Sequence, residues 1–114
     1  MSTISTHVLD LARGIPATGM GVTLEIYRPD RGWVKLAEKE TDPDGRVREF
    51  NKAGSALDPG HYRLTFEVGE YFRAHGEPTF YPEVPVVFDV RDPTQGYHVP
   101  LLVSPFGYST YRGS

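Results

Sequence analysis

The sequence predicts an all-β protein: a transthyretin-like β-sandwich of two sheets, with one short helix. Several segments alternate apolar and polar side chains, which is the period of a strand with one buried face. Twelve glycines and ten prolines are spread along the chain and separate these segments, as turns between short strands do. A chain of 114 residues is large enough for one core, so we expect a single domain over residues 1–114.

The first half of the chain predicts a β-hairpin. Residues 22–27 alternate strictly between apolar and polar side chains, and residues 33–39 alternate less regularly, with Val34 and Leu36 as their apolar face. The intervening residues 28–32 include a proline, an aspartate and a glycine, which favour a reversal of the chain.

The second half predicts two further strands and the helix. Residues 62–68 alternate most clearly of all, and residues 84–90 form another apolar segment. Pro85 cannot donate to a β-ladder, which favours a position where no ladder donor is needed. Between these strands, residues 69–76 predict a short helix that Gly76 closes at its C′ position.

The segment Asp42-Pro-Asp-Gly45 predicts a tight turn. Proline presets φ, aspartate bonds to nearby backbone and glycine adopts positive φ; the further ligands of a calcium loop are missing. Arg46 follows this turn directly. An arginine at such a position is most often a solvated charge, although its planar guanidinium also suits carbonyl oxygens and anionic heterocycles.

Composition excludes several classes of function. A formal net charge of −3 gives no reason to expect nucleic acid or an anionic membrane as a partner. The absence of cysteine excludes disulfides, thiolate metal sites and a cysteine nucleophile. No secretory signal is visible, and no apolar stretch approaches the ~20 residues of a membrane helix. We therefore expect a soluble, cytoplasmic protein.

Histidines are the first candidates for chemistry, because their unperturbed pKa lies near working pH. His7 and His98 each lie on a strand-like segment beside apolar side chains. Either one alone reads as a structural histidine, and their matching surroundings alone do not assign a function. His61 and His75 fall in no recognised pattern and are expected to be solvated or structural.

Metal and serine hydrolase chemistry have little support. The sequence contains no His-x-His, no His-x3-His and no carboxylate-rich cluster, so a metal site is not expected. The serine hydroxyls, including those of Ser5 and Ser114, lie in no Gly-x-Ser-x-Gly elbow. A catalytic serine triad is therefore not expected.

Three motifs together resemble those of the transthyretin-like 5-hydroxyisourate hydrolases. They are Ser5-Thr-His-Val-Leu-Asp10, Asp42-Pro-Asp-Gly-Arg-Val47 and Tyr111-Arg-Gly-Ser114, in this order and with the third at the end of the chain. The resemblance covers nearly the whole sequence. It implies the transthyretin fold, with about eight strands in two sheets and one short helix after the fifth strand.

The resemblance also implies an activity. Water would open the six-membered ring of 5-hydroxyisourate, a bicyclic oxidised purine, to give 2-oxo-4-hydroxy-4-carboxy-5-ureidoimidazoline in urate degradation, without a cofactor. By the resemblance, His98 and His7 would orient and activate the water, and Arg46 would bind substrate oxygens and stabilise charge. Tyr111 and Ser114 would close and shape the site.

The resemblance further implies a homotetramer, a dimer of dimers whose central channel holds the sites. A small sandwich has little concave surface of its own, so a pocket at an interface is physically reasonable. One alternative is a non-catalytic carrier of the transthyretin kind, in which the histidines, the arginine and the terminal motif are replaced. A second is an immunoglobulin-like interaction domain, which leaves the terminal motif unexplained.

Overall fold

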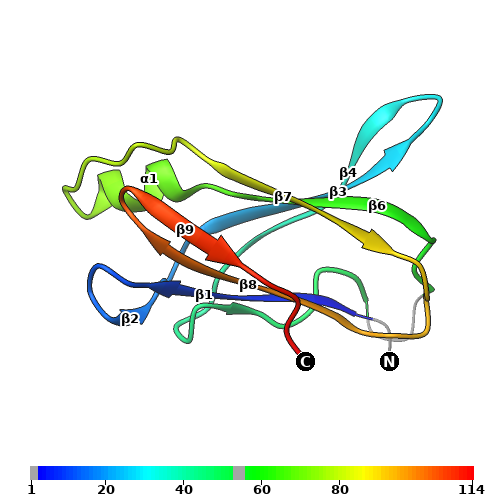
Figure 1. The fold of residues 1–114 in the computed structure, drawn as a ribbon, viewed down its shortest axis with the longest axis horizontal. Helices are drawn as coiled ribbons and strands as arrows, with labels where there is room; N and C mark the ends of the chain where they lie inside the picture. Colours follow the sequence, from blue (N-terminus) through cyan, green and yellow to red (C-terminus); the bar gives the residue numbers. More distant parts are fainter. Residues whose placement is uncertain (1–2, 53–55) are drawn as a thin grey trace.

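The computed structural model describes residues 3–52 and 56–114, and within them it contains nine strands and one short helix. The strands form two sheets that face each other (Figure 1). One sheet has the order β2-β1-β8-β9, with β5 also paired to β1, and the other has the order β4-β3-β6-β7. The elements are β1 (Ile4–Asp10), β2 (Ile15–Pro16), β3 (Gly21–Arg28), β4 (Gly32–Glu40), β5 (Arg46–Val47), β6 (Gly60–Phe66), α1 (Val68–Ala74), β7 (Val84–Val90), β8 (Tyr97–Ser104) and β9 (Gly107–Thr110).

The predicted fold class is confirmed, and the strand count differs by one. About eight strands were expected, whereas the described part of the chain has nine. Two of these, β2 and β5, are pairings of only two residues with β1. When these two short strands are counted, the helix follows the sixth strand of the chain and not the fifth.

The predicted hairpin is present as β3 and β4, but the apolar face of β4 was assigned wrongly at Leu36. The register shifts so that Leu24 lies opposite Ala37 and Glu25 opposite Lys35, which leaves Leu36 as the extra residue of a β-bulge. Leu36 is 49% exposed, while Ala37 packs against the core. A single extra residue reverses the alternation beyond it.

The predicted strand over residues 62–68 ends earlier than expected. β6 stops at Phe66, and Val68 is the first residue of α1. Val68 is still fully buried, so the apolar alternation continues although the backbone has turned into the helix. At the other end, Gly76 has a φ of 73° and donates its N–H to the Arg73 carbonyl, as expected of a C′ glycine.

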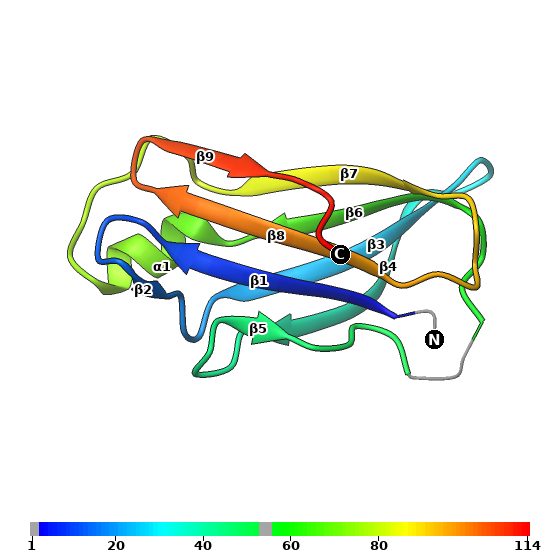
Figure 2. The ribbon, with the colours of Figure 1, turned by 60° about the horizontal axis from the view of Figure 1, so that its bottom comes forward.

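The core fills the space between the two sheets, so each strand has one buried and one outward face. In β1, Ile4 and Val8 are completely buried, whereas Ser5 and His7 lie on the other side of the strand and are half-buried. In Figure 2 the C-terminal segment leaves β9 and returns across β8, so the end of the chain lies against the outward face of this sheet. No helix in the described residues is long and apolar enough to cross a membrane.

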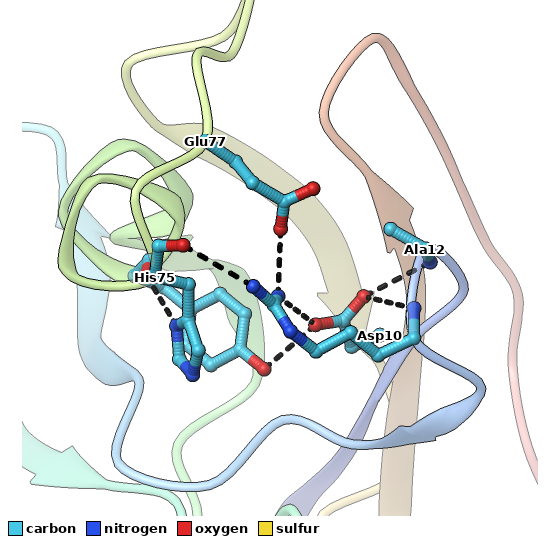
Figure 3. A network of polar contacts seen from close by, with 6 residues as sticks. Asp10, Ala12, His75 and Glu77 are labelled. Atoms are coloured by element: carbon cyan, nitrogen blue, oxygen red, sulfur yellow. Dashed lines mark hydrogen bonds and ion pairs between the residues drawn. The ribbon is translucent and has the colours of Figure 1, made fainter.

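A buried carboxylate joins the end of β1 to the helix (Figure 3). Asp10 has no exposed surface, and it accepts hydrogen bonds from the Ala12 and Arg13 backbone, from the Arg13 guanidinium at 3.1 Å and from the Tyr71 hydroxyl at 2.8 Å. Arg13 also forms an ion pair of 2.7 Å with Glu77. Because every donor comes from the β1–β2 turn or from α1, this network holds the two elements together.

The same network sets the pKa values of its members. Burial by itself raises the pKa of Asp10, but the hydrogen bonds from Tyr71, Arg13 and Ala12 outweigh it and hold that pKa below its ordinary value. Burial, followed by the hydrogen bond to Asp10 and its charge, raises the pKa of Tyr71 to about 12. The pair therefore stays as a carboxylate and a neutral phenol at neutral pH.

Replacing Tyr71 with phenylalanine should destabilise the protein, because Asp10 would lose a donor inside the core. We expect the free energy of unfolding to fall by about 1–3 kcal/mol, the usual effect of removing one partner of a buried charged group. Urea denaturation of the wild type, Tyr71→Phe and Tyr27→Phe would measure it. Tyr27 is 43% exposed and serves as the matched loss of a hydroxyl; equal effects of the two variants would contradict the role of the Asp10 network.

Candidate active site

The candidate site lies on the outward face of the sheet where β1, β5 and β8 meet. In the parallel pairing of β1 with β8, Ser5 lies opposite His98. In the antiparallel pairing of β1 with β5, His7 lies opposite Arg46. Ser5 and His7 are two residues apart on one strand and share its outward face, so their partners share that face as well. Three strands therefore bring two histidines, one arginine and one serine together.

The turn before β5 positions both Arg46 and His7. The Asp42 carboxylate accepts the backbone N–H groups of Asp44 and Arg46, each at 2.9 Å. These hydrogen bonds also lower the pKa of Asp42, and the one from Arg46 is the larger cause. Gly45 has a φ of 77°, and its carbonyl accepts the Val8 N–H on β1 at 2.7 Å.

Glycine is required at position 45 on two grounds. Its positive φ is unfavourable for other residues, and a Cβ there would collide with the carbonyl oxygen of Val8. The turn can therefore press directly against β1 beside His7. The Asp42-Pro-Asp-Gly45 motif is thus a positioning device for the arginine that follows it.

His7 has one ring nitrogen engaged by this turn. Its Nε2 lies 3.0 Å from the carbonyl oxygen of Asp44. A carbonyl can only accept, so Nε2 carries the hydrogen in this contact. In the neutral form of His7, Nδ1 is then the nitrogen with a free lone pair.

His98 is held by both ends of the chain. Its Nδ1 lies 2.9 Å from the Ser5 hydroxyl oxygen, and its carbonyl accepts the N–H of Gly113 at 2.8 Å. Burial lowers the pKa of His98, and electrostatic interaction with Arg46 and, to a smaller extent, with His7 lowers it further. His98 is therefore a neutral imidazole at neutral pH, which is the form that can accept a proton from water.

A cleft of about 410 Å³ opens over these groups and is bordered by Ser5, Arg46, His98 and Ser114. A smaller hollow of about 120 Å³ beside it shares Ser5, Arg46 and His98. None of the described residues that line either space is acidic. Within the described chain, no carboxylate lies within ion-pair distance of Arg46, in contrast to Arg48, which has Asp44 at 3.6 Å.

The five predicted site residues are thus not all in one cavity. The structure brings Arg46, His98 and Ser114 to the same cleft, and His7 lies next to them on the strand face. Tyr111 is 59% exposed and borders a separate hollow of about 240 Å³. His98 lines this second hollow too, so it is the residue that the two spaces share.

Two residues of the site region were not assigned from the sequence. Ser5 was set aside as a nucleophile, although its position two residues before His7 already indicated the same strand face. Arg112 holds the terminal segment: its guanidinium donates to the Gln95 side chain at 2.9 Å and lies 4.7 Å from the centre of the Tyr97 ring. These contacts explain why this end of the chain is ordered against β8.

A larger hollow of the described structure lies elsewhere and has a different character. It measures about 780 Å³, lies between α1 and the β3–β4 hairpin, and is bordered by Glu38, Glu40, Glu67 and Glu70. Burial raises the pKa of Glu67, and the neighbouring carboxylates raise it further. Such a surface repels anions, and it does not combine a neutral imidazole with a guanidinium. The cleft over Arg46 is smaller, but it is the better candidate site.

Metal ligation has no candidate in the part of the chain that the structure describes. No group of three or more histidine, aspartate or glutamate side chains there could hold a metal ion. The chemistry that the described cleft offers is that of a neutral imidazole beside an unpaired guanidinium.

The fold and the cleft together define a transthyretin-like β-sandwich that carries histidine and arginine side chains on the outward face of one sheet. The chain belongs to the HIUase/Transthyretin family, whose model matches residues 4–113. It is 49% identical to a 5-hydroxyisourate hydrolase of Caulobacter vibrioides over 119 aligned residues, which cover all of both chains.

Solved structures agree with this assignment. The 5-hydroxyisourate hydrolase of Klebsiella pneumoniae superposes with a TM-score of 0.86 at 35% identity, covering 99% of this chain and 100% of the other. Sea bream transthyretin in complex with thyroxine superposes with a TM-score of 0.90 at 28% identity, covering 97% and 94% of the two chains. The fold is therefore common to a hydrolase and to a transthyretin solved in complex with thyroxine, and the site has to decide between them.

The pKa of His98 should lie below 6.5, and replacing Arg46 with glutamine should raise it. The variant removes the positive charge of Arg46, which opposes protonation of the ring. An NMR titration of His98 would measure the change, with Arg31→Gln, in the distant β3–β4 turn, as a control of equal charge. An unchanged His98 pKa in Arg46→Gln would contradict the proximity of the two groups.

The lowered pKa of His98 also makes the free energy of unfolding depend on pH. Between the lowered pKa of folded His98 and 6.5, the unfolded chain binds more protons than the folded one. The contribution of His98 to stability is therefore present above that window and is lost as the pH falls through it.

Proposed function

We propose that this chain hydrolyses 5-hydroxyisourate. The observation that carries the proposal is the cleft in which neutral His98 and unpaired Arg46 face the same space. Names of relatives that are similar over their full length, such as the one from Caulobacter vibrioides, support the same activity. A carrier of the transthyretin kind needs no base and no guanidinium at this place.

The proposed reaction is the addition of one water to a carbonyl–nitrogen bond of the six-membered ring. His98, with His7 orienting the water, takes one proton while the water oxygen attacks the carbonyl carbon. The carbon–nitrogen bond then breaks, and the proton passes to the leaving nitrogen. The carbonyl carbon becomes a carboxylate and the nitrogen part of a ureido group, which gives 2-oxo-4-hydroxy-4-carboxy-5-ureidoimidazoline, an intermediate of urate degradation.

Arg46 has the chemistry to bind the substrate and to stabilise charge. Its guanidinium presents two parallel donors to carbonyl oxygens, including the oxygen that becomes negative in the transition state. No carboxylate of the described chain neutralises it. In this proposal water activation and charge stabilisation belong to His98 and Arg46, so the mechanism uses neither a metal nor another cofactor.

We further propose that the active form is a homotetramer, a dimer of dimers with the sites in a central channel. The cleft of one protomer is open, and Tyr111 lies outside it with more than half of its surface exposed. A second copy packed against this face would enclose the substrate. Tyr111 and Ser114 would then contact the second copy and form part of the wall of the site. Among the strands that the structure describes, β9 has no neighbour on its outer side, so it is available for pairing.

The first test is turnover itself. Freshly generated 5-hydroxyisourate should lose its ultraviolet absorbance much faster with the protein than without it. His98→Asn keeps the polarity and size of the side chain but loses its basicity, and we expect it to lower kcat by roughly 10²–10⁴-fold, the usual contribution of one positioned base. His61→Asn is the control, because His61 is an exposed residue of the other sheet.

Two outcomes would overturn the proposed activity. Wild-type protein that leaves the decay of 5-hydroxyisourate unchanged would favour the carrier. A folded His98→Asn protein with the turnover of the wild type would remove His98 from the chemistry, whatever the activity of the chain.

The tetramer can be tested separately by light scattering at micromolar concentration. We expect a mass of four chains, and we expect dilution that dissociates the assembly to lower activity along with it, because the open cleft is enclosed only by a second copy. A monomer with full activity would contradict the shared channel and leave the single-protomer cleft as the complete site.

A further inference from the structure

The imidazole of His98 is confined along its edges. On one side, Nδ1 is 2.9 Å from the Ser5 hydroxyl oxygen. On another, the Cα of Gly113 lies so close that a Cβ there would be 2.5 Å from Cδ2 and 3.3 Å from Cγ of the ring. Any side chain at position 113 would force the ring or the terminal segment to move. The ring therefore lies between Ser5 on β1 and Gly113 near the end of the chain, and both contact it.

The position of Ser5 relative to His98 is fixed by the pairing of their two strands. β1 and β8 pair in parallel over seven consecutive positions, with Ser5 directly opposite His98. The next residue, Thr6, is buried and donates its hydroxyl to the Val99 carbonyl, which locks the same register from the inner face. A shift of one position would turn all of these side chains to the wrong face of the sheet.

We propose that Ser5 is a positioning residue: its hydroxyl oxygen accepts the Nδ1–H of His98 and so leaves Nε2 as the nitrogen with the free lone pair. The inference rests on the proposed function, in which His98 activates the water. A neutral imidazole carries one N–H, and the partner of one nitrogen decides which nitrogen carries it. Ser5 is the side-chain partner that the described structure gives to Nδ1.

The direction of this hydrogen bond follows from what the ring must do during the reaction. When Nε2 takes a proton from water, the ring becomes a cation that carries N–H groups on both nitrogens. A serine oxygen that already accepts Nδ1–H keeps its hydrogen bond through this change, and the bond strengthens as positive charge develops. A serine that donated to Nδ1 would have to rotate its hydroxyl away at the same moment.

The two histidines of the site then present different nitrogens. His7 donates Nε2–H to the Asp44 carbonyl and keeps Nδ1 free, whereas His98 donates Nδ1–H to Ser5 and keeps Nε2 free. Their tautomers are set by different strands and loops. Ser5 therefore determines which edge of His98 can meet the water, without touching the substrate's reacting atoms itself.

The tautomer can be read directly by ¹⁵N NMR of the uniformly labelled full-length protein at a pH where His98 is neutral. Protonated and unprotonated ring nitrogens differ widely in chemical shift, and the His98→Asn variant identifies the signals that belong to His98. We expect the wild type to show Nδ1 protonated and Nε2 unprotonated. In Ser5→Ala this preference should be lost, and Ser5→Thr, which retains a hydroxyl at the same place, should restore it.

Activity supplies the second readout. Ser5→Ala should lower kcat about 10-fold or more, the usual range for losing a hydrogen bond to a group that becomes charged, with KM changed much less. Ser5→Thr should recover most of the loss. Ser104→Ala is the matched control, because Ser104 is a half-buried serine of β8 whose hydroxyl bonds to the Gly107 carbonyl; it should change neither the tautomer nor kcat.

The outcomes separate this inference from the proposed function. A wild-type His98 with Nε2 protonated, or a Ser5→Ala protein with the wild-type tautomer, would overturn the role of Ser5 even if the chain hydrolyses 5-hydroxyisourate. A chain without that activity, but with the tautomer switched by Ser5→Ala and restored by Ser5→Thr, would uphold the Ser5–His98 interaction and overturn only the reaction assigned to it.

Discussion

The parallel pairing of β1 with β8 is the contact on which the rest of the site depends. It joins residues that are 93 positions apart, as between Ser5 and His98, and it provides the strand on which β5 then pairs. Seven consecutive positions hold the register, while the inner faces of both strands are buried in the core. The hydrophobic core and the site therefore use opposite faces of the same two strands, and neither can shift without the other.

Local pattern was sufficient for the elements whose two faces differ strongly. β3, β6 and β7 each have one face that is more buried than the other. Apolar alternation predicted β3 and β6, and an apolar segment predicted β7, each to within one or two residues. Alternation gave the wrong result where the backbone departs from a regular strand. Leu36 is the extra residue of a bulge, and Val68 is buried like a strand residue but begins a helix. Two-residue pairings such as β5 have no period to detect.

The sequence could predict which residues belong to the site, but not which cavity each of them borders. The motifs singled out His7 and Arg46, the family resemblance added His98, and the three lie together on one sheet face. That Tyr111 borders a different hollow depends on where the terminal segment crosses β8, which is decided by the Gly113 bridge and by Arg112 on the Tyr97 ring. No local pattern encodes such contacts, because each requires the register between strands far apart in the sequence.

The bulge at Leu36 has a consequence for how copies of this chain can meet. β4 forms one border of its sheet, and next to the bulge it exposes charges of both signs on Lys35, Glu38 and Lys39. A distorted, charged border is a poor template for an added strand, so fibre-like growth of the sheet from this side is disfavoured. β9 carries no charge and no bulge, so backbone pairing between copies is favoured at the sheet border that β9 forms.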